Sequence, residues 1–161
     1  MGDSAIVRFL ANDGRDAAGR TFEDVLALSD VCLERRHDFI QWLFPLTEPS
    51  AAVPGSPVLT DADIQALRDS EIARARLARA GKRMLAFYRA TDAWRAPADH
   101  NHLRITRIIR SLRLLCGDAA ADRFREGSLP WPTARRSARR AETTGIAPRR
   151  GAAVPAFCGT R

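Results

Sequence analysis

The stretch HDFIQWLFP, residues 37–45, places three polar side chains inside an otherwise apolar run. They are His37, Asp38 and Gln41, and the remaining residues are aromatic, aliphatic or proline. A run this apolar is typical of a hydrophobic core, where a polar group without a partner costs about 1–3 kcal/mol. The rest of the chain must therefore supply polar partners for these side chains, and this requirement constrains the fold.

The segments on the N-terminal side of this run predict helices. Ser4, Thr21 and Ser29 are suitable N-caps for helices that begin just after them. The helical pattern after Ser29 continues over residues 33–44, until Pro45 removes a backbone donor and disfavours helix at the residue before it. We therefore expect three helices before Pro45, the third extending through Phe44.

The segments after the run predict an extended connection and then further helices. Four prolines over residues 45–59 indicate an extended segment. Thr60 with Asp63 forms a capping-box pattern that starts the next helix. Later helices are expected over residues 71–89, 102–115 and 118–126, with Gly117 ending the second of them.

No segment of useful length alternates apolar and polar residues as a strand would. The sequence therefore predicts an all-α domain over residues 4–128, with about six to seven helices and a Pro-rich loop between two of them. Residues 129–161 are rich in Arg, Pro and Ala, a composition typical of a disordered tail.

The net charge of +7 is concentrated in this tail. From residue 134 onward the chain has seven arginines and one glutamate, whereas residues 1–133 have 19 basic and 18 acidic residues. A basic tail can bind nucleic acid or an acidic surface without sequence specificity. An alternative function is therefore that of a nucleic-acid-associated accessory protein, acting through Arg135, Arg136, Arg139 and Arg140.

The sequence has no apolar run of the ~20 residues that a membrane-spanning helix needs, and no secretory-type N-terminal segment. We therefore expect a cytoplasmic location.

Two segments together resemble the conserved region of the opioid growth factor receptor family. The first is Leu33-Glu34 followed by the run at residues 37–45, and the second is HNHLRITRIIRSL at residues 100–112. Residues 50–60 and 84–88 fit the same pattern. The resemblance covers roughly residues 5–117, and it departs where Cys116 interrupts the expected Leu-Gly helix end.

This resemblance implies a helical domain that binds an enkephalin-type peptide. In animals the family is associated with the nuclear envelope and nucleus and with restraint of cell proliferation, and its receptor label carries a membrane association. The animal proteins also have long C-terminal repeats, which this sequence does not show. No catalytic residue is implied, so we expect a non-enzymatic domain that binds a peptide, a small ligand or a protein.

The polar residues of the two segments allow two interpretations. In the first they form a structural latch, in which Glu34 or Asp38 pairs with Arg104 or Arg107 to neutralise buried charge and align two helices. In the second they form a ligand pocket between the Trp42 helix and the Arg104 helix, with apolar walls and a few convergent polar groups. The candidate ligand-binding residues are His37, Asp38, Gln41, Trp42, Asn101, Arg104 and Arg107.

Catalytic and metal-binding interpretations have less support. The spacing of His37, His100 and His102 does not match a known zinc motif, and residues two apart on a helix lie on different faces. An acid–base pair of His37 and Asp38 stays open as an enzymatic alternative without a suggested substrate. We therefore expect no cofactor and no metal. The arginines at 104, 107, 110 and 113 could form a phosphate-binding stripe, but the near-neutral charge of the domain favours a solvated face with acidic partners.

Overall fold

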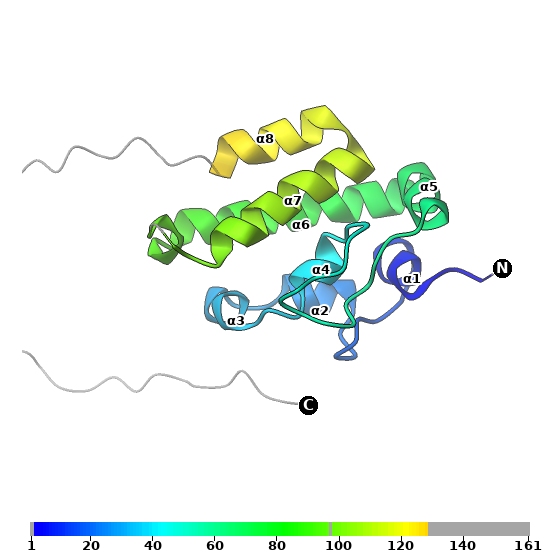
Figure 1. Ribbon diagram of the computed structural model, residues 1–161, viewed down its shortest axis with the longest axis horizontal. Coiled ribbons are helices and arrows are strands. Elements are labelled where there is room, and N and C mark those ends of the chain that lie inside the picture. The colour runs from blue at the N-terminus through cyan, green and yellow to red at the C-terminus, as the bar shows by residue number, and fades with distance from the viewer. Residues whose placement is uncertain (1, 97, 129–161) are drawn as a thin grey trace, which may run out of the picture. The chain divides into compact units, whose positions relative to one another are not determined.

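The computed structural model describes residues 2–96 and 98–128, and this part of the chain is helical with no sheet. The all-α prediction is confirmed, with eight α-helices and one short 3-10 turn in the described ranges (Figure 1). The expected tail at residues 129–161 lies outside the described residues. The elements are α1 Ala5–Ala11, α2 Phe22–Leu26, α3 Asp30–Arg35, α4 Ile40–Leu43, α5 Asp61–Asp69, α6 Glu71–Ala90, η1 Ala93–Arg95, α7 Asn101–Cys116 and α8 Asp118–Ser128.

The helix starts follow the capping residues of the sequence. Ser4, Thr21, Ser29 and Thr60 each accept a backbone N–H of the first helical turn through the side-chain oxygen. At Thr21 and Thr60 the aspartate three residues later also accepts the N-cap N–H, which completes a capping box. The predicted starts of α1, α2, α3 and α5 are therefore confirmed.

The longest helices, α6 and α7, contact each other, and α8 folds back along α7 and α6 (Figure 1). The reversal between α7 and α8 occurs at Gly117, whose φ of 87° is in the region that favours glycine. On another side, α1 contacts α4, α5 and α6. Four of its seven residues are buried, which makes it part of the core.

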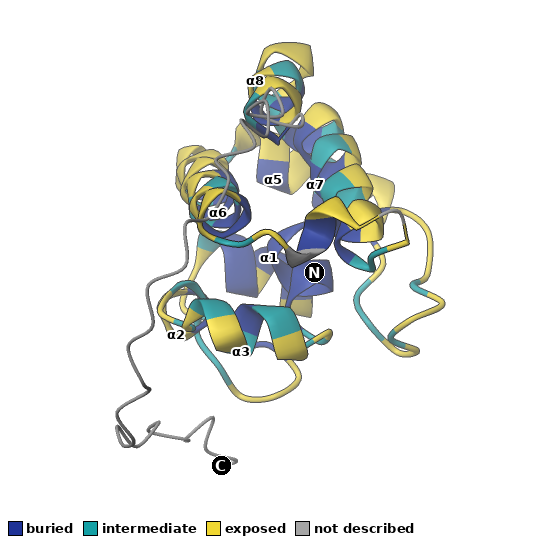
Figure 2. Cartoon of the chain, turned by 90° about the vertical axis from the view of Figure 1, so that its left-hand side faces the viewer, coloured by how far each residue is buried: buried dark blue, intermediate teal, exposed yellow. Residues whose placement is uncertain are grey.

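Burial follows one face of each long helix (Figure 2). On α7 the interior face carries Ile108, Leu112 and Leu115, while Ile105 and Ile109 pack partly against the same cluster. On α6 it carries Leu77, Met84 and Phe87 among others. The apolar stripe of α7 is therefore the side that faces the core.

The prediction of a helix continuing over residues 33–44 is wrong. Helix α3 ends at Arg35, because Arg36 is extended with φ −92° and ψ 139°. A short loop follows, and α4 contains only Ile40–Leu43. His37 and Asp38 therefore lie in a loop rather than on a helix face shared with Gln41.

The Pro-rich connection contains no helix, as predicted, but it folds back on itself as a loop with a turn instead of running extended. Leu46 and Val58 form an isolated parallel bridge, in which the Leu59 N–H donates to the Leu46 carbonyl over 2.9 Å. This pairing holds the two ends of the loop together, so residues 47–57 project as a loop beside α4. Among the described residues, no helix combines the length and apolar character needed to cross a bilayer.

Candidate ligand-binding site

Arg104 joins α7 to the C-terminal end of α3. Its side chain reaches the main chain at the C-terminal end of α3, and the residue is only 5% exposed. Nη1 donates to the Leu33 carbonyl over 2.8 Å and to the Asn101 side chain over 3.0 Å, and Nη2 donates to the carbonyls of Glu34 and Arg36. Because the last carbonyls of a helix have no partner within it, a cation placed here is favourable.

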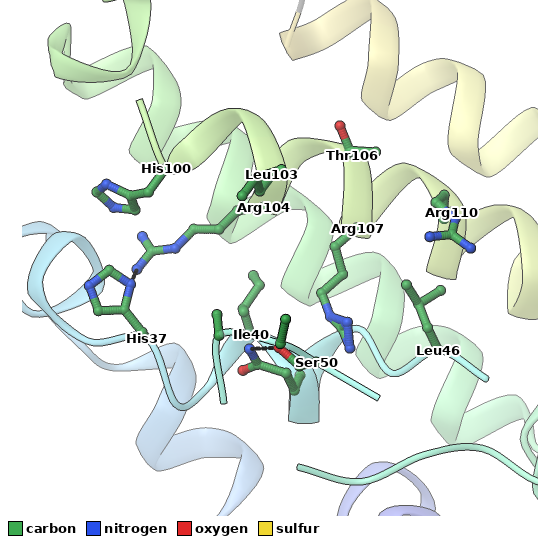
Figure 3. A pocket seen from close by; sticks show the side chains of 13 residues that line it. His37, Ile40, Leu46, Ser50, His100, Leu103, Arg104, Thr106, Arg107 and Arg110 are labelled. Carbon is green, nitrogen blue, oxygen red and sulfur yellow. Dashed lines mark hydrogen bonds between the residues drawn. The ribbon is translucent and has the colours of Figure 1, made fainter. Parts of the chain in front are cut away.

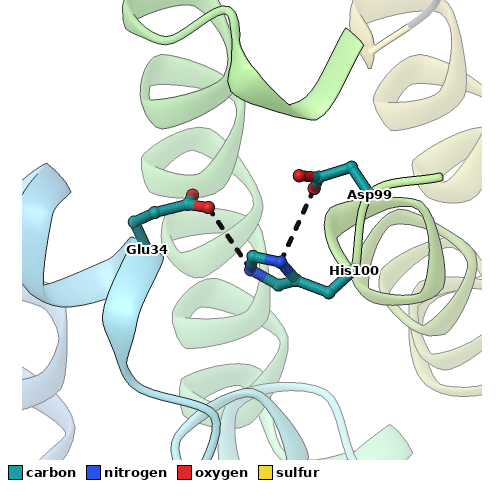
Figure 4. Close-up of side chains that lie close together, drawn as sticks. All are labelled: Glu34, Asp99 and His100. Carbon is teal, nitrogen blue, oxygen red and sulfur yellow. Dashed lines mark ion pairs between the residues drawn. The ribbon is translucent and has the colours of Figure 1, made fainter. Parts of the chain in front are cut away.

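The Glu34 side chain contacts the other end of this connection. The buried Asn101 amide donates to Glu34 Oε2 over 3.1 Å. His100 lies between two carboxylates, with Nε2 3.4 Å from Glu34 and Nδ1 3.8 Å from Asp99 (Figure 4). These three side chains come close enough to hold a cation in principle, but their mutual contacts and the Asn101 bond already account for the arrangement.

Asp38 pairs differently from the sequence expectation. Its carboxylate lies 3.2 Å from Arg20, which also pairs with the buried Asp16. Arg104 contacts Glu34 through the Glu34 main chain, and the Glu34 carboxylate instead meets Asn101 and His100. Arg104 thus does connect the two segments, but through carbonyl groups rather than through the carboxylates of the proposed latch.

A pocket of about 320 Å³ opens between α4, the Pro-rich loop and α7 (Figure 3). This volume falls near the lower end of the ~300–1,000 Å³ typical of small-molecule sites. The walls combine aliphatic side chains with basic and amide groups. The lining residues are His37, Ile40, Gln41, Leu46, Ser50, Ala51, Ala52, His100, Leu103, Arg104, Thr106, Arg107 and Arg110.

The predicted ligand-binding residues divide into two groups. His37, Gln41, Arg104 and Arg107 line the pocket, whereas Asp38, Trp42 and Asn101 do not. Trp42 is instead a core residue, 8% exposed and in edge-to-face contact with Phe9 at 5.5 Å between ring centroids. Asn101 is fully buried behind the pocket and positions Glu34 and Arg104.

The pocket also contains residues that sequence reasoning missed. From the N-cap of α7 onward it is lined at positions 100, 103, 104, 106, 107 and 110, most of which recur at helical spacing on a flank away from the apolar stripe. Leu103 on this flank is 75% exposed, an apolar residue outside the core face. The sequence alone therefore contains a signal for this side of the pocket, namely a second row of residues at helical spacing. The contribution of Ser50, Ala51 and Ala52 carries no such signal, because it depends on how the loop folds back.

The arginine series on α7 is not uniformly solvated, contrary to the sequence expectation. Arg110 and Arg113 are exposed and pair with acids, Arg110 with Glu48 and Arg113 with Asp118 and Asp122. Arg104 is buried and Arg107 is half-buried. Burial lowers the pKa of both, with nearby Glu48 opposing this effect at Arg107.

The histidines at the mouth of the pocket contact each other. The rings of His37 and His100 meet edge-to-face at 5.0 Å. Partial burial lowers the pKa of His37, and the neighbouring Arg104 and His100 lower it further. The site therefore favours an uncharged His37. Its fixed positive charge comes from the arginines, and this charge suits a ligand with an anionic group.

The comparisons with known proteins point to one family. Residues 22–93 match the family model described as the opioid growth factor receptor (OGFr) conserved region. The opioid growth factor receptor of Rattus norvegicus is 42% identical over 98 residues, which cover 50% of this chain and 17% of that protein. That of Homo sapiens is 35% identical over 136 residues, which cover 69% of this chain and 20% of that protein.

A second name appears among the relatives. The opioid growth factor receptor-like protein 1 of Xenopus tropicalis is 35% identical over 97 residues, covering 50% of this chain and 19% of that protein. The chain thus spans about a fifth or less of the length of these relatives. No solved structure matches the chain.

Proposed function

From the premise that this chain carries the conserved region of the opioid growth factor receptor family at residues 22–93, we propose that it is a non-enzymatic binding domain. Its ligand, a peptide or another small molecule, occupies the pocket between α4 and α7. The relatives are named as receptors, which is consistent with binding rather than catalysis.

The observation that carries this proposal is the composition of the pocket. It has aliphatic walls, an exposed Leu103 at its rim, and polar atoms that find no partner among the described residues. A cavity that served only to connect helices would have its polar groups paired, because unpaired buried ones cost about 1–3 kcal/mol each. Apolar walls with a few convergent polar groups are the usual composition of a small-ligand site.

The relatives are named as receptors for an opioid growth factor. The family resemblance of the sequence implies an enkephalin-type peptide, which is therefore the first ligand to test. The pocket segment from His37 to Ala52 falls within the matched region. The α7 side of the pocket lies beyond it, in the segment at residues 100–112 whose sequence resembles the same family.

The test is a calorimetric titration of the full chain with an enkephalin-type peptide, supported by thermal shift. Ala51→Trp fills the pocket from an exposed loop position, and Ala119→Trp places the same side chain on exposed α8 as a control. We expect the wild type and Ala119→Trp to bind and Ala51→Trp to lose binding. Equal binding by all three proteins would place the ligand elsewhere.

The charge of the C-terminal segment supports a second candidate function. Residues 134–161 carry seven arginines and one glutamate, so this segment has the electrostatic character of a non-specific nucleic-acid binder. Its four closely spaced arginines are Arg135, Arg136, Arg139 and Arg140. If the proposal holds, the full chain binds DNA or RNA at low salt and a chain ending at residue 133 does not. Absence of salt-sensitive binding by the full chain would remove this candidate.

A further inference from the structure

Arg107 differs from the other arginines on α7 in lacking a hydrogen-bond partner at two of its nitrogens, although the charge of Glu48 lies nearby. The Nε and Nη2 atoms of its guanidinium are buried, and neither has a hydrogen-bond partner among the described residues. These two nitrogens form one edge of the guanidinium, and their N–H groups point in parallel. That edge is the geometry that binds a carboxylate with two hydrogen bonds.

Arg107 lines the pocket, while its Nε and Nη2 atoms are buried at the pocket wall. Figure 3 shows its side chain extending from α7 toward the segment that carries Ser50. Its neighbours on α7 are otherwise engaged, Arg104 by main-chain carbonyls and Arg110 by Glu48. Arg107 therefore brings to the pocket wall a cation with two buried donors that have no hydrogen-bond partner among the described residues.

Gln41 provides the complementary acceptor. It is 3% exposed, and its side-chain N–H donates to Ser50 Oγ over 3.2 Å. Ser50 Oγ also accepts the Val53 backbone N–H over 3.3 Å, which fixes the hydroxyl at the turn of the loop. The Gln41 amide is thereby oriented, and its Oε1 is buried with no partner among the described residues. A ligand that satisfies it must donate a hydrogen bond.

The remaining wall is apolar. Ile40 and Leu46 are buried residues that line the pocket, and Leu103 adds an exposed isobutyl group at its rim. A ligand that matches the pocket therefore combines an anionic group, a hydrogen-bond donor and an apolar side chain.

We propose that the pocket binds an α-amido carboxylate, the group formed by the C-terminal residue of a peptide. The carboxylate accepts from Nε and Nη2 of Arg107, the amide N–H donates to Gln41 Oε1, and the side chain packs on Ile40, Leu46 and Leu103. This inference rests on the proposed binding function and specifies which end of the ligand the pocket recognises.

Inorganic phosphate or a simple carboxylate fits the pocket less well. Either would satisfy Arg107, but neither has an N–H to offer Gln41 nor an apolar group for the aliphatic wall. With a simple carboxylate the buried oxygen of Gln41 would stay unpaired, at the cost that applies to any buried acceptor. Phosphate can donate a P–OH to that oxygen, but it leaves the aliphatic wall without a partner. An α-amido carboxylate satisfies all three features together.

The same group occurs in two sources, the end of a peptide chain and a free N-acylated amino acid. Both are used as probes of the isotopically labelled full chain by NMR titration. The first pair is N-acetyl-leucine and its C-terminal amide, and the second is an acetylated Ala-Ala-Leu tripeptide as acid and as amide. Acetate and phosphate are added as simple anions.

We expect each acid to bind at least about tenfold more tightly than its amide, because the amide cannot accept two charge-assisted hydrogen bonds. The Arg107 Nε–H resonance should move with the acids. A tripeptide that binds more tightly than N-acetyl-leucine would identify a peptide end as the source, and equal binding would identify the single amino acid. Either result supports the proposal.

Three variants separate the roles of the two side chains. Arg107→Gln should abolish the preference for acid over amide, and Gln41→Met, which keeps the side-chain length without the oxygen, should weaken the acids severalfold. Arg113→Gln removes an exposed guanidinium on the same helix but outside the pocket, and it should keep the preference. Unfolding curves of each variant establish that it is folded at the titration temperature.

The outcomes distinguish this inference from the proposed function. If acid and amide bind equally and Ala51→Trp abolishes both, the pocket is a binding site but carboxylate recognition is wrong. Binding of acetate or phosphate as tight as that of the acids would also overturn the inference, and so would failure of every acid to bind. If the enkephalin-type peptide fails to bind as well, the proposed function for such ligands fails with it.

Discussion

The guanidinium of Arg104 and the imidazole of His37 lie in hydrogen-bond contact, with Nη2 3.2 Å from Nδ1. A guanidinium has only donors, so Nδ1 of His37 must accept and must therefore be unprotonated. The contact links the protonation of a loop residue to the buried side chain that joins α7 to α3. It also makes a second proton on the His37 ring, the proton on Nδ1, unfavourable in the folded chain.

The first prediction concerns the pH dependence of stability. The folded chain lowers the pKa of His37 below its ordinary value of 6.5, through partial burial and then the charges of Arg104 and His100. At pH values below 6.5 the unfolded chain therefore binds more protons than the folded chain, so this contribution to stability is present above pH 6.5 and is lost as the pH falls through the folded pKa. The effect is modest, because solvent screens a ring that is partly exposed.

Urea unfolding at about pH 7.5 and pH 5.5, on either side of the ordinary histidine pKa, tests this dependence. His37→Asn retains an acceptor near the position of Nδ1 but does not titrate in this range. We expect the wild type to lose more stability on acidification than His37→Asn. The same loss in both proteins would mean that His37 does not contribute to the pH dependence.

The second prediction concerns Arg104 itself. Arg104→Ala should destabilise the fold by about 3 kcal/mol or more, because it removes a buried charged donor and leaves several carbonyls unpaired. Arg104→Lys should recover little of this loss, since one ammonium cannot reproduce the planar fork. Arg113→Ala is the matched control on the same helix, and its exposed pairs should be worth about 0.5 kcal/mol. Equal losses for Ala at both positions would contradict this assignment.

The third prediction concerns the start of α5. The Thr60 hydroxyl accepts the Asp63 backbone N–H over 3.2 Å, and the Asp63 carboxylate accepts the Thr60 N–H over 2.9 Å. Thr60→Ala should cost about 1 kcal/mol in the free energy of unfolding, whereas Thr60→Ser should cost little because it keeps the oxygen. Chemical denaturation measures both, and a Ser variant as unstable as the Ala variant would assign the effect to the lost methyl group instead.

The fourth prediction concerns the turn after α1. A Cβ at Gly14 would lie 2.5 Å from the Arg8 carbonyl carbon and 2.6 Å from the Phe9 nitrogen, both backbone atoms that cannot move aside freely. Gly14→Ala should therefore destabilise by about 1–3 kcal/mol, as overpacking does elsewhere. Gly2→Ala, where no atom lies within 4 Å, is the control and should leave the midpoint of thermal unfolding unchanged.

Local signals in the sequence were sufficient for most of the helices. Ser4, Thr21, Ser29 and Thr60 act through hydrogen bonds within a single turn, so their effect can be predicted without tertiary structure. The break after Arg35 could not be predicted in this way. The carbonyls there are taken by Arg104, a residue about 70 positions later, and no local pattern contains that interaction.

The candidate site shows the same limit. The sequence directed attention to His37, Gln41, Arg104 and Arg107, because polar residues in apolar or amphipathic segments need partners. It could not predict that Arg20 would pair with Asp38 or that Trp42 would pack on Phe9 in the core. Those contacts depend on the path of the loops. In the sequence alone, several polar residues of similar chemistry could have served as partners.

The dependence of α3 on Arg104 has a consequence for the order of folding. Helix α3 has six residues, and a helix of this length is not stable alone in water. Its terminal carbonyls receive their donor only when residues near position 104 have been synthesised and have folded back. While only residues 1–100 have emerged from the ribosome, the end of α3 therefore lacks its contact with Arg104 of α7. We expect α3 and the His37 loop to be among the last parts of the domain to become ordered.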